Sequence, residues 1–292
     1  MEKGVHMVVN NISQVKIDSL GRSGPLVPSA LTSLKEIEKQ IRGHGIAVFL
    51  DYDGTLTPIV DDPEKALIQE HMRNSLATLS NLCTVAVISG RDLSDVREKV
   101  GLDDIVYAGS HGFDIAGSKN MNVQSQRGEE FLPLLDTAEE RLREQLESVE
   151  GALVERKKFS LAVHYRKVKK ENVKTVEDIV DDVIHEQPRL RKSTGKKVFE
   201  VQPGIDWHKG KAMLWLIENM DLQEKDIVTF YIGDDNTDED AFDSLPERGI
   251  GIAVMEKPRS TAARYVLKNP AEVEKFIRAL AEFLGGIAEY DE

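Results

Sequence analysis

The 292-residue sequence has a single cysteine, Cys83, and no long run of apolar residues. One cysteine excludes an internal disulfide and fits a reducing compartment, and its place at the start of an apolar run predicts a core side chain. No apolar stretch approaches the roughly 18–20 residues needed to cross a bilayer. The opening residues also lack the apolar block of a secretory signal. We therefore expect a cytoplasmic protein with no membrane partner.

Positive charge is scarce as well, since 38 Lys and Arg face 51 Asp and Glu and leave a formal net charge of -13. Binding a nucleic acid relies on clustered Lys and Arg, so we expect no nucleic-acid partner. Between Phe113 and Pro203 basic and acidic residues number 17 each, so the flanking parts carry the net charge. An acidic surface that meets a phosphate group needs a cation to mask it, which favours a bound divalent metal.

What the sequence does contain is an alternation of short apolar runs with segments of helical periodicity. This alternation is typical of a Rossmann-like parallel sheet covered by helices on both faces. The expected strands are 46–50, 84–88, 104–108, 227–232 and 249–254, and the expected later helices are 209–220, 238–245 and 271–284.

The middle of the chain has a different pattern, with two helices around residues 131–146 and 173–184, one long strand over 153–165 and another over 198–201. Two helices backing a small antiparallel sheet predict a separate α+β cap, or lid, inserted into an α/β core. We place the cap at residues 113–205 and the core at 44–112 and 206–292. Residues 1–43 are expected to form a loosely ordered extension that ends in a helix over 31–41.

Two aspartates, Asp51 and Asp53, directly follow the first apolar strand and precede a glycine and a threonine. A carboxylate at a rigid strand end can attack phosphorus and form an aspartyl phosphate, which divides one difficult hydrolysis into two displacements. The carboxyl two residues further on can protonate the leaving oxygen and then activate water. We therefore predict Asp51 as the nucleophile and Asp53 as the general acid and base.

Three later segments supply groups that such a reaction needs. Ser89 ends the second strand and can donate a hydrogen bond to a phosphoryl oxygen, because open parallel sheets bind ligands at this edge. Lys209 begins a helix, where its ammonium can neutralise developing charge, whereas Lys211 is expected to be a surface lysine. Asp234 follows another apolar strand and, with Asp51 and the carbonyl of Asp53, predicts a Mg²⁺ site. Asp235 and Asp238 are expected either to hold metal-bound waters or to brace Lys209.

In order along the chain, LDYDGTLTPI, ISGR, DWHKGKA and GDDNTDEDAF resemble the four motifs of the haloacid dehalogenase superfamily. With YAGSHGFDI, VERKKFSLAVHYR and KVFEVQPGI, the chain is similar to the trehalose-6-phosphate phosphatases, and most of all to plant-type members. The family's K-G-x-A pattern is what selects Lys209 over Lys211.

The resemblance implies a Mg²⁺-dependent phosphatase whose partner is a small sugar phosphate, and we expect the protein to be a monomer. The resemblance also implies that Glu155, Lys157 and Glu200 of the cap bind sugar hydroxyls, and that Arg91, His111 and Gly112 lie at the hinge side of the cleft. His164 and Arg166 either join this set or only brace the cap. Gln202 stands where the family often has arginine, which leaves the contribution of that position open.

Three other interpretations stay open at this point. The chain could hydrolyse another sugar phosphate, such as sucrose 6-phosphate. It could be a phosphoacceptor domain, although such a module is usually a single domain of about 120 residues and needs neither Asp53 nor a cap. It could also be an inactive relative used for binding, although every motif residue is present.

Overall fold

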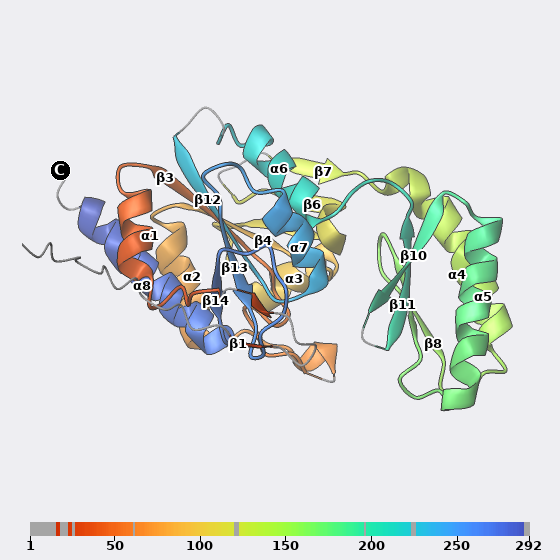
Figure 1. The fold of residues 1–292 in the computed structure, drawn as a ribbon. Helices are drawn as coiled ribbons and strands as arrows, with labels where there is room; N and C mark the ends of the chain where they lie inside the picture. The colour runs from red at the N-terminus through yellow and green to blue at the C-terminus, as the bar shows by residue number, and fades with distance from the viewer. Residues whose placement is uncertain are drawn as a thin grey trace, which may run out of the picture.

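The computed structural model describes residues 16–17, 23–24, 27–60, 62–119, 123–195, 197–222 and 226–288. Two bodies stand side by side, a larger core built on one sheet and a smaller cap built on another (Figure 1). The fold class expected from the sequence, a parallel α/β core with an inserted α+β cap, is confirmed.

The core sheet has eight strands in the order β14-β13-β12-β3-β4-β5-β6-β7, and the first six of these run parallel. β3 lies in the middle with hydrogen-bonded neighbours on both sides, and its last five residues are buried, as expected for an apolar strand covered on both faces. The six parallel strands are β3 (Gly45–Leu50), β4 (Thr84–Ile88), β5 (Val106–Gly109), β12 (Ile227–Gly233), β13 (Ile250–Val254) and β14 (Tyr265–Leu267).

Helices cover both faces of this sheet, and each face has its own apolar cluster. One face is covered by α1 (Leu34–Ile41), α2 (Glu70–Ser80), α3 (Leu93–Val100) and α8 (Pro270–Ala288), and the other by α6 (Lys209–Asn219) and α7 (Asn236–Asp243). Cys83 packs at the border of the first cluster, as the sequence predicts for a core side chain. Burial raises the pKa of its thiol to about 12.

Two strands inside the predicted cap range belong to the core sheet by their hydrogen bonds. β6 (Asp114–Ala116) pairs antiparallel with β5, and β7 (Gln124–Gln126) pairs with β6, so this hairpin extends the edge of the large sheet. Sequence analysis did not anticipate the hairpin, because neither three-residue strand is long enough to show a period. The exact limits of the cap stay a prediction.

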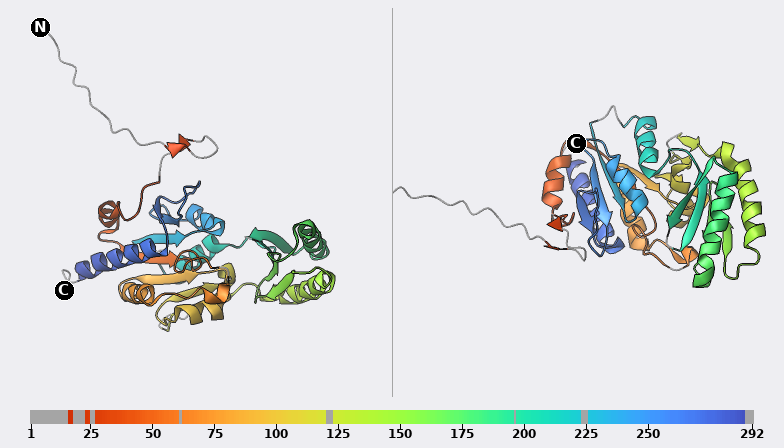
Figure 2. Two further views of the ribbon diagram at one scale, coloured as in Figure 1. Left: turned by 90° about the horizontal axis from the view of Figure 1, so that it is seen from below. Right: turned by 45° about the vertical axis from the view of Figure 1, so that its right-hand side comes forward.

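The cap is a four-stranded antiparallel sheet backed by two helices on the side away from the core (Figures 1 and 2). Its interior lies between sheet and helices, where alternate strand residues join the apolar stripe of each helix. Its elements are α4 (Leu132–Leu146), β8 (Leu153–Arg156), β9 (Leu161–His164), α5 (Val173–Glu186), β10 (Leu190–Gly195) and β11 (Val198–Pro203).

The single long strand expected over residues 153–165 is wrong. The segment forms the hairpin β8–β9, joined by the four residues Lys157, Lys158, Phe159 and Ser160. None of these is a Gly, Pro, Asn or Asp, and Ser160 alone is a weaker turn signal than those residues. β10 was also not expected, although it completes the sheet beside β11.

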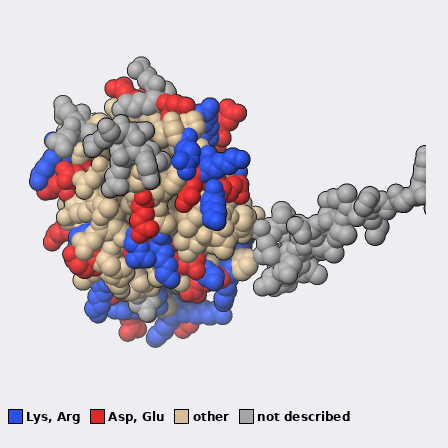
Figure 3. Space-filling model, turned by 90° about the vertical axis from the view of Figure 1, so that its left-hand side faces the viewer, with Lys and Arg blue, Asp and Glu red and all other residues tan. Residues whose placement is uncertain are grey.

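Much of the predicted extension over residues 1–43 lies outside the described residues. Within it, the structure describes the two-residue strands β1 (Lys16–Ile17) and β2 (Ser23–Gly24), and the expected helix is present as α1. No described helix combines the length and the apolarity that a bilayer crossing requires. On the face shown in Figure 3, acidic and basic side chains are interspersed over the described surface.

Candidate active site

The predicted catalytic groups meet at the carboxyl ends of β3, β4 and β12. Lys209, the first residue of α6, is 2 % exposed, and its Nζ lies 2.7 Å from Asp51 Oδ1 and 2.8 Å from Asp238 Oδ1. Asp51 is 4 % exposed and its backbone N–H donates to the carbonyl of Ile232 on the neighbouring strand. One buried ammonium therefore joins two carboxylates that lie on opposite sides of the cap in the sequence.

Asp238 braces Lys209, which is one of the two roles predicted for Asp235 and Asp238. Its Oδ1 accepts from Lys209 and also from the Tyr231 hydroxyl at 2.8 Å, while its Oδ2 accepts from the backbone N–H of Asp235 at 3.0 Å. Asp235 caps α7 by accepting from the N–H groups of Thr237 and Asp238. Its Oδ1 lies 3.9 Å from Lys209 Nζ.

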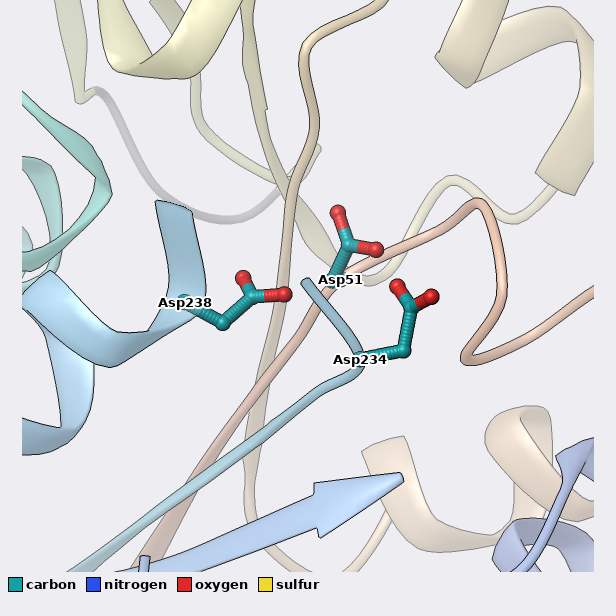
Figure 4. A group of neighbouring side chains, drawn as sticks. All are labelled: Asp51, Asp234 and Asp238. Atoms are coloured by element: carbon teal, nitrogen blue, oxygen red, sulfur yellow. The ribbon is translucent and has the colours of Figure 1, made fainter. Parts of the chain in front are cut away.

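Asp51, Asp234 and Asp238 form a group in which each offers one carboxylate oxygen, and these three oxygens lie within 4.8 Å of one another (Figure 4). No hydrogen bond or ion pair to the Asp234 side chain is found within the described part of the chain, so this carboxylate is available. Gly54 passes directly over it with φ +88°, and a Cβ at Gly54 would overlap the Asp234 carboxylate. A hard, oxygen-seeking cation such as Mg²⁺ fits this donor set.

The electrostatics of the group depend on burial. Burial raises the pKa of Asp51 well above its usual range, against the opposing effect of Lys209. Burial, together with the charges of Asp238 and Asp235, raises the pKa of Asp234 to about 7. Burial alone would lower the pKa of Lys209, but the carboxylates of Asp238 and Asp51 outweigh it and hold that pKa above its ordinary value. The ammonium therefore stays charged.

Asp53 does not point into the acidic group. Both of its oxygens accept from Arg91, at 2.7 Å from Nε and 2.8 Å from Nη2. Arg91 also binds Asp95 and the carbonyl of Pro63, and its guanidinium lies 5.3 Å from the centre of the Tyr52 ring. Arg91, predicted at the hinge side of the cleft, is thus a 9 % exposed side chain that orients Asp53.

Ser89 directly follows β4 and is held next to a strained loop. Ser110 and His111 are both in the left-handed region, with φ 50° and 57°, which costs of the order of 1–3 kcal/mol for each residue. Backbone bonds from Ser110 N to Arg91 O and from His111 N to Ser89 O hold this conformation. The following Gly112 approaches α6 so closely that a Cβ would overlap Ala212. This backbone conformation places the His111 ring against Gly90, beside Ser89.

The predicted sugar-binding residues of the cap share one face of its sheet. Ala162 pairs with Glu155 on one side and with Glu200 on the other, so these side chains and that of His164 lie opposite the face packed on the cap helices. Glu155 Oε2 lies 2.7 Å from His164 Nε2, and this hydrogen bond lowers the pKa of Glu155.

Glu200 connects the cap with the core. One of its oxygens lies 3.5 Å from Lys157 Nζ and the other 3.8 Å from His111 Nε2. Burial would raise the pKa of Glu200, but His111 and Lys157 together lower it to about 2. Because the folded-state pKa is lowered, this carboxylate contributes stability above its usual pKa and loses it as the pH falls toward about 2.

Three other predicted residues occupy different surroundings. Arg166 lies in an exposed turn beyond the end of β9, so the expected strand alternation of His164 and Arg166 is wrong. Gln202 is buried in β11 and its Nε2 lies 3.5 Å from Ser193 Oγ. Lys211 is partly exposed and pairs with Asp206 at the surface.

Sequence analysis missed two residues that shape the site. Tyr231 precedes the motif within β12 and looks like an ordinary core aromatic. Arg259 comes from the loop after β13, and its Nη2 donates to the carbonyl of Asp234 at 2.9 Å while its Nη1 binds Glu239 on α7. No local pattern marks Arg259, because its partners are about 20 residues away in sequence. Beside Asp234, a cleft of about 630 Å³ opens between Leu56–Ile59 and Met255–Lys257.

The fold, with carboxylates and a lysine at the carboxyl edge of its parallel sheet, is the arrangement that the sequence motifs predict for a phosphatase of the haloacid dehalogenase type. The family model for trehalose-phosphatase matches residues 49–271. The chain belongs to the trehalose-phosphatase family.

Plant proteins are similar over most of the chain. Trehalose-phosphate phosphatase B of Arabidopsis thaliana is 41 % identical over 267 residues, covering 88 % of this chain and 71 % of that protein. Probable trehalose-phosphate phosphatase 4 of Oryza sativa subsp. japonica is 43 % identical over 261 residues, with coverage of 88 % and 71 %.

Solved structures agree in fold. The C-terminal domain of trehalose-6-phosphate phosphatase from C. albicans has a TM-score of 0.74 and 23 % identity, covering 88 % of this chain and 98 % of that one. Trehalose-6-phosphate phosphatase from Aspergillus fumigatus has a TM-score of 0.66 and 27 % identity, covering 88 % and 99 %.

Proposed function

We propose that this protein hydrolyses trehalose 6-phosphate to trehalose and inorganic phosphate. The observation that carries the proposal is the buried triad of Asp51, Lys209 and Asp238 at a sheet edge faced by a polar cap surface. The plant relatives support the choice of substrate, since their names specify trehalose phosphate and the similarity extends through the cap.

In this mechanism Asp51 attacks phosphorus and forms an aspartyl phosphate. Asp53 turns from Arg91, takes up a proton from solvent and donates it to the departing sugar oxygen. The resulting carboxylate then accepts a proton from the water that attacks the phosphorus of the phosphoenzyme, and it releases this proton to solvent when it pairs with Arg91 again. Lys209 and Ser89 bind the phosphoryl oxygens and stabilise their developing charge. Arg91 returns Asp53 to its resting position.

Asp51, Asp234 and the backbone carbonyl of Asp53 would hold Mg²⁺. The bound ion would offset the repulsion between these carboxylates and the phosphate and would keep Asp51 ionised. Asp238 lies in the same oxygen group, but Lys209 and Tyr231 already occupy its Oδ1.

The cap supplies selectivity. Glu155, Lys157 and Glu200 suit a ligand with many hydroxyls, because charged groups make strong hydrogen bonds to them. His164 supports Glu155 through their direct contact. The monomeric state and the cytoplasmic location remain predictions.

A substrate panel tests the assignment. Phosphate release is measured from trehalose 6-phosphate, sucrose 6-phosphate and glucose 6-phosphate, with Mg²⁺ and with a chelator. We expect trehalose 6-phosphate to be preferred and the chelator to abolish turnover. Comparable turnover of the other two sugar phosphates would defeat the trehalose assignment, and full activity in the chelator would defeat the metal assignment.

Metal binding should depend on pH through Asp234. With its pKa raised to about 7, this carboxyl holds a proton at lower pH that Mg²⁺ must displace. The apparent Mg²⁺ affinity should therefore fall by at least about tenfold for each pH unit below 7, because Mg²⁺ must also displace a proton from Asp51 where its raised pKa leaves it protonated. Calorimetry between pH 5.5 and 8.5, in buffers of different ionisation enthalpy, measures both the affinity and the released proton. A constant affinity between pH 5.5 and 7 would contradict the prediction.

The variant Glu200→Gln should affect sugar binding more than chemistry. It keeps the shape of the side chain but removes the charge that pairs with Lys157 and His111. We expect the KM for trehalose 6-phosphate to rise about tenfold, the effect of losing one charged hydrogen bond. Hydrolysis of p-nitrophenyl phosphate, which has no sugar, should stay within twofold of the parent. A parallel loss with both substrates would show that Glu200 serves the fold.

A further inference from the structure

The turn between β8 and β9 in the cap inserts a side chain into the core. Phe159 is fully buried and belongs to the apolar cluster formed by β4, β5 and α6, although it comes from the cap hairpin. Its ring centre lies 6.1 Å from that of Phe113. Gly128 leaves room for this ring, since a Cβ there would overlap Phe159. The buried Phe159 side chain therefore joins the cap to the core, in addition to the two connecting segments of the chain.

Both carboxylate oxygens of Asp92 accept a hydrogen bond from the same turn. The backbone N–H of Lys158 lies 3.0 Å from Asp92 Oδ1 and 3.2 Å from Oδ2. Asp92 stands at the N-cap position of α3, where aspartate usually accepts from its own helix, yet it makes no such bond. The carboxylate instead accepts from Lys158 and, at 2.9 Å, from the Ser110 hydroxyl.

The contacts of Asp92 link three segments around the site. Asp92 follows Ser89 by three residues, Ser110 begins the strained loop that carries His111, and Lys158 is adjacent to Lys157. Lys157 Nζ lies 3.5 Å from the carbonyl of Gly90 as well as from Glu200. On the other side of the turn, Lys158 Nζ lies 2.6 Å from buried Asp114. A shift of this turn would move Lys157 relative to Ser89.

We propose that Asp92 is a positioning residue for substrate selectivity. By holding the β8–β9 turn, with Phe159 as its apolar anchor, it fixes the distance between the sugar-binding groups Lys157 and Glu200 and the phosphate-binding Ser89. A sugar phosphate must contact both ends of this span at once, so a looser span weakens its binding. A phosphate ester without a sugar uses only the core end. The inference depends on the proposed function for the identity of the sugar phosphate.

The main test replaces Asp92 with serine. Asp92→Ser keeps a residue that caps helices well, so α3 is retained, but its side chain is too short to accept from Lys158 as the carboxylate does. We expect kcat/KM for trehalose 6-phosphate to fall about tenfold or more, mainly through KM. Activity on p-nitrophenyl phosphate should stay within twofold. The separate variant Asp92→Asn keeps an acceptor oxygen at the same distance from the backbone, so its kcat/KM should stay within about threefold of that of the parent.

Two further variants complete the test. Asp103→Ser makes the same change at an exposed aspartate that pairs with Lys119, and it should leave both activities unchanged. Phe159→Ala removes the apolar anchor without altering Asp92 and should reproduce the selective loss on the sugar phosphate, so the test does not depend on the folding of one variant.

Three results would overturn the inference. The first is trehalose 6-phosphate kinetics within twofold of the parent in Asp92→Ser, and the second is an equal loss on both substrates in that variant. The third is a loss in Asp92→Asn as large as that in Asp92→Ser. If the parent protein itself does not hydrolyse trehalose 6-phosphate, the proposed function fails instead. The two failures are therefore distinguishable.

Discussion

Asp51→Asn should lower phosphate release by about four orders of magnitude, because the carboxamide cannot attack phosphorus and no other described carboxylate takes its place. Asp234 is assigned to the metal, Asp238 is engaged by Lys209 and Tyr231, and Asp53 is held by Arg91. The loss should be equal for trehalose 6-phosphate and p-nitrophenyl phosphate, since both share the phosphoryl transfer. Colorimetric phosphate release over long incubations measures it.

The thermal stability of Asp51→Asn should not fall with its activity. The raised pKa of Asp51 means that the ionised carboxylate disfavours the folded state at neutral pH, so its removal should leave the melting temperature unchanged or raise it. An acid quench of the parent protein during turnover, followed by borohydride reduction, should convert a phosphorylated residue 51 to homoserine, which mass spectrometry of its peptide detects. An unchanged aspartate at residue 51, or activity of Asp51→Asn within tenfold of the parent, would falsify the nucleophile assignment.

The second large effect is expected for Lys209→Met, which keeps the length of the side chain but removes its charge. Phosphoryl transfer should slow by about a hundredfold to a thousandfold, the usual effect of losing one stabilising donor. Folding should also weaken by about 3–5 kcal/mol, since Asp51 and Asp238 then remain buried without their shared partner. Denaturant melts and single-turnover kinetics measure the two losses separately.

A second substitution separates charge balance from catalysis. Adding Asp238→Asn to Lys209→Met removes one of the two orphaned carboxylates and should recover much of the stability while leaving the rate low. Lys211→Met is the matched control, because that lysine is partly exposed and pairs only with Asp206 among the described residues. Its rate and stability should match those of the parent. Recovery of the rate in the double variant would contradict a catalytic role for the Lys209 charge.

The core of the fold and the meeting of the candidate catalytic residues at one sheet edge could be predicted because their signals are local. The apolar run before Asp51 and the one before Asp234 each identify a buried strand, and parallel strands bring their following residues to one edge. Lys209 begins a helix within a short motif. In each case a few neighbouring residues determine both the element and the position of the functional side chain.

The remainder depends on contacts between distant segments. Phe159 extends the β-favouring pattern of residues 153–165, so the sequence reads as one strand, whereas its ring is buried against the core. Arg259 and Asp92 look like ordinary loop and cap residues until their partners are known. The partner of Asp53 was missed for the same reason, because 38 residues separate it from Arg91.

The insertion of the cap between β7 and α6 has a consequence for the order of synthesis. Asp51 and Ser89 are translated before the cap, and Lys209 and Asp234 after it. β3 can pair with β4 early, but its other edge has to wait for β12. A ribosome-bound chain therefore completes its cap while the catalytic centre is still half made, and phosphatase activity begins only after Lys209 and Asp234 have emerged.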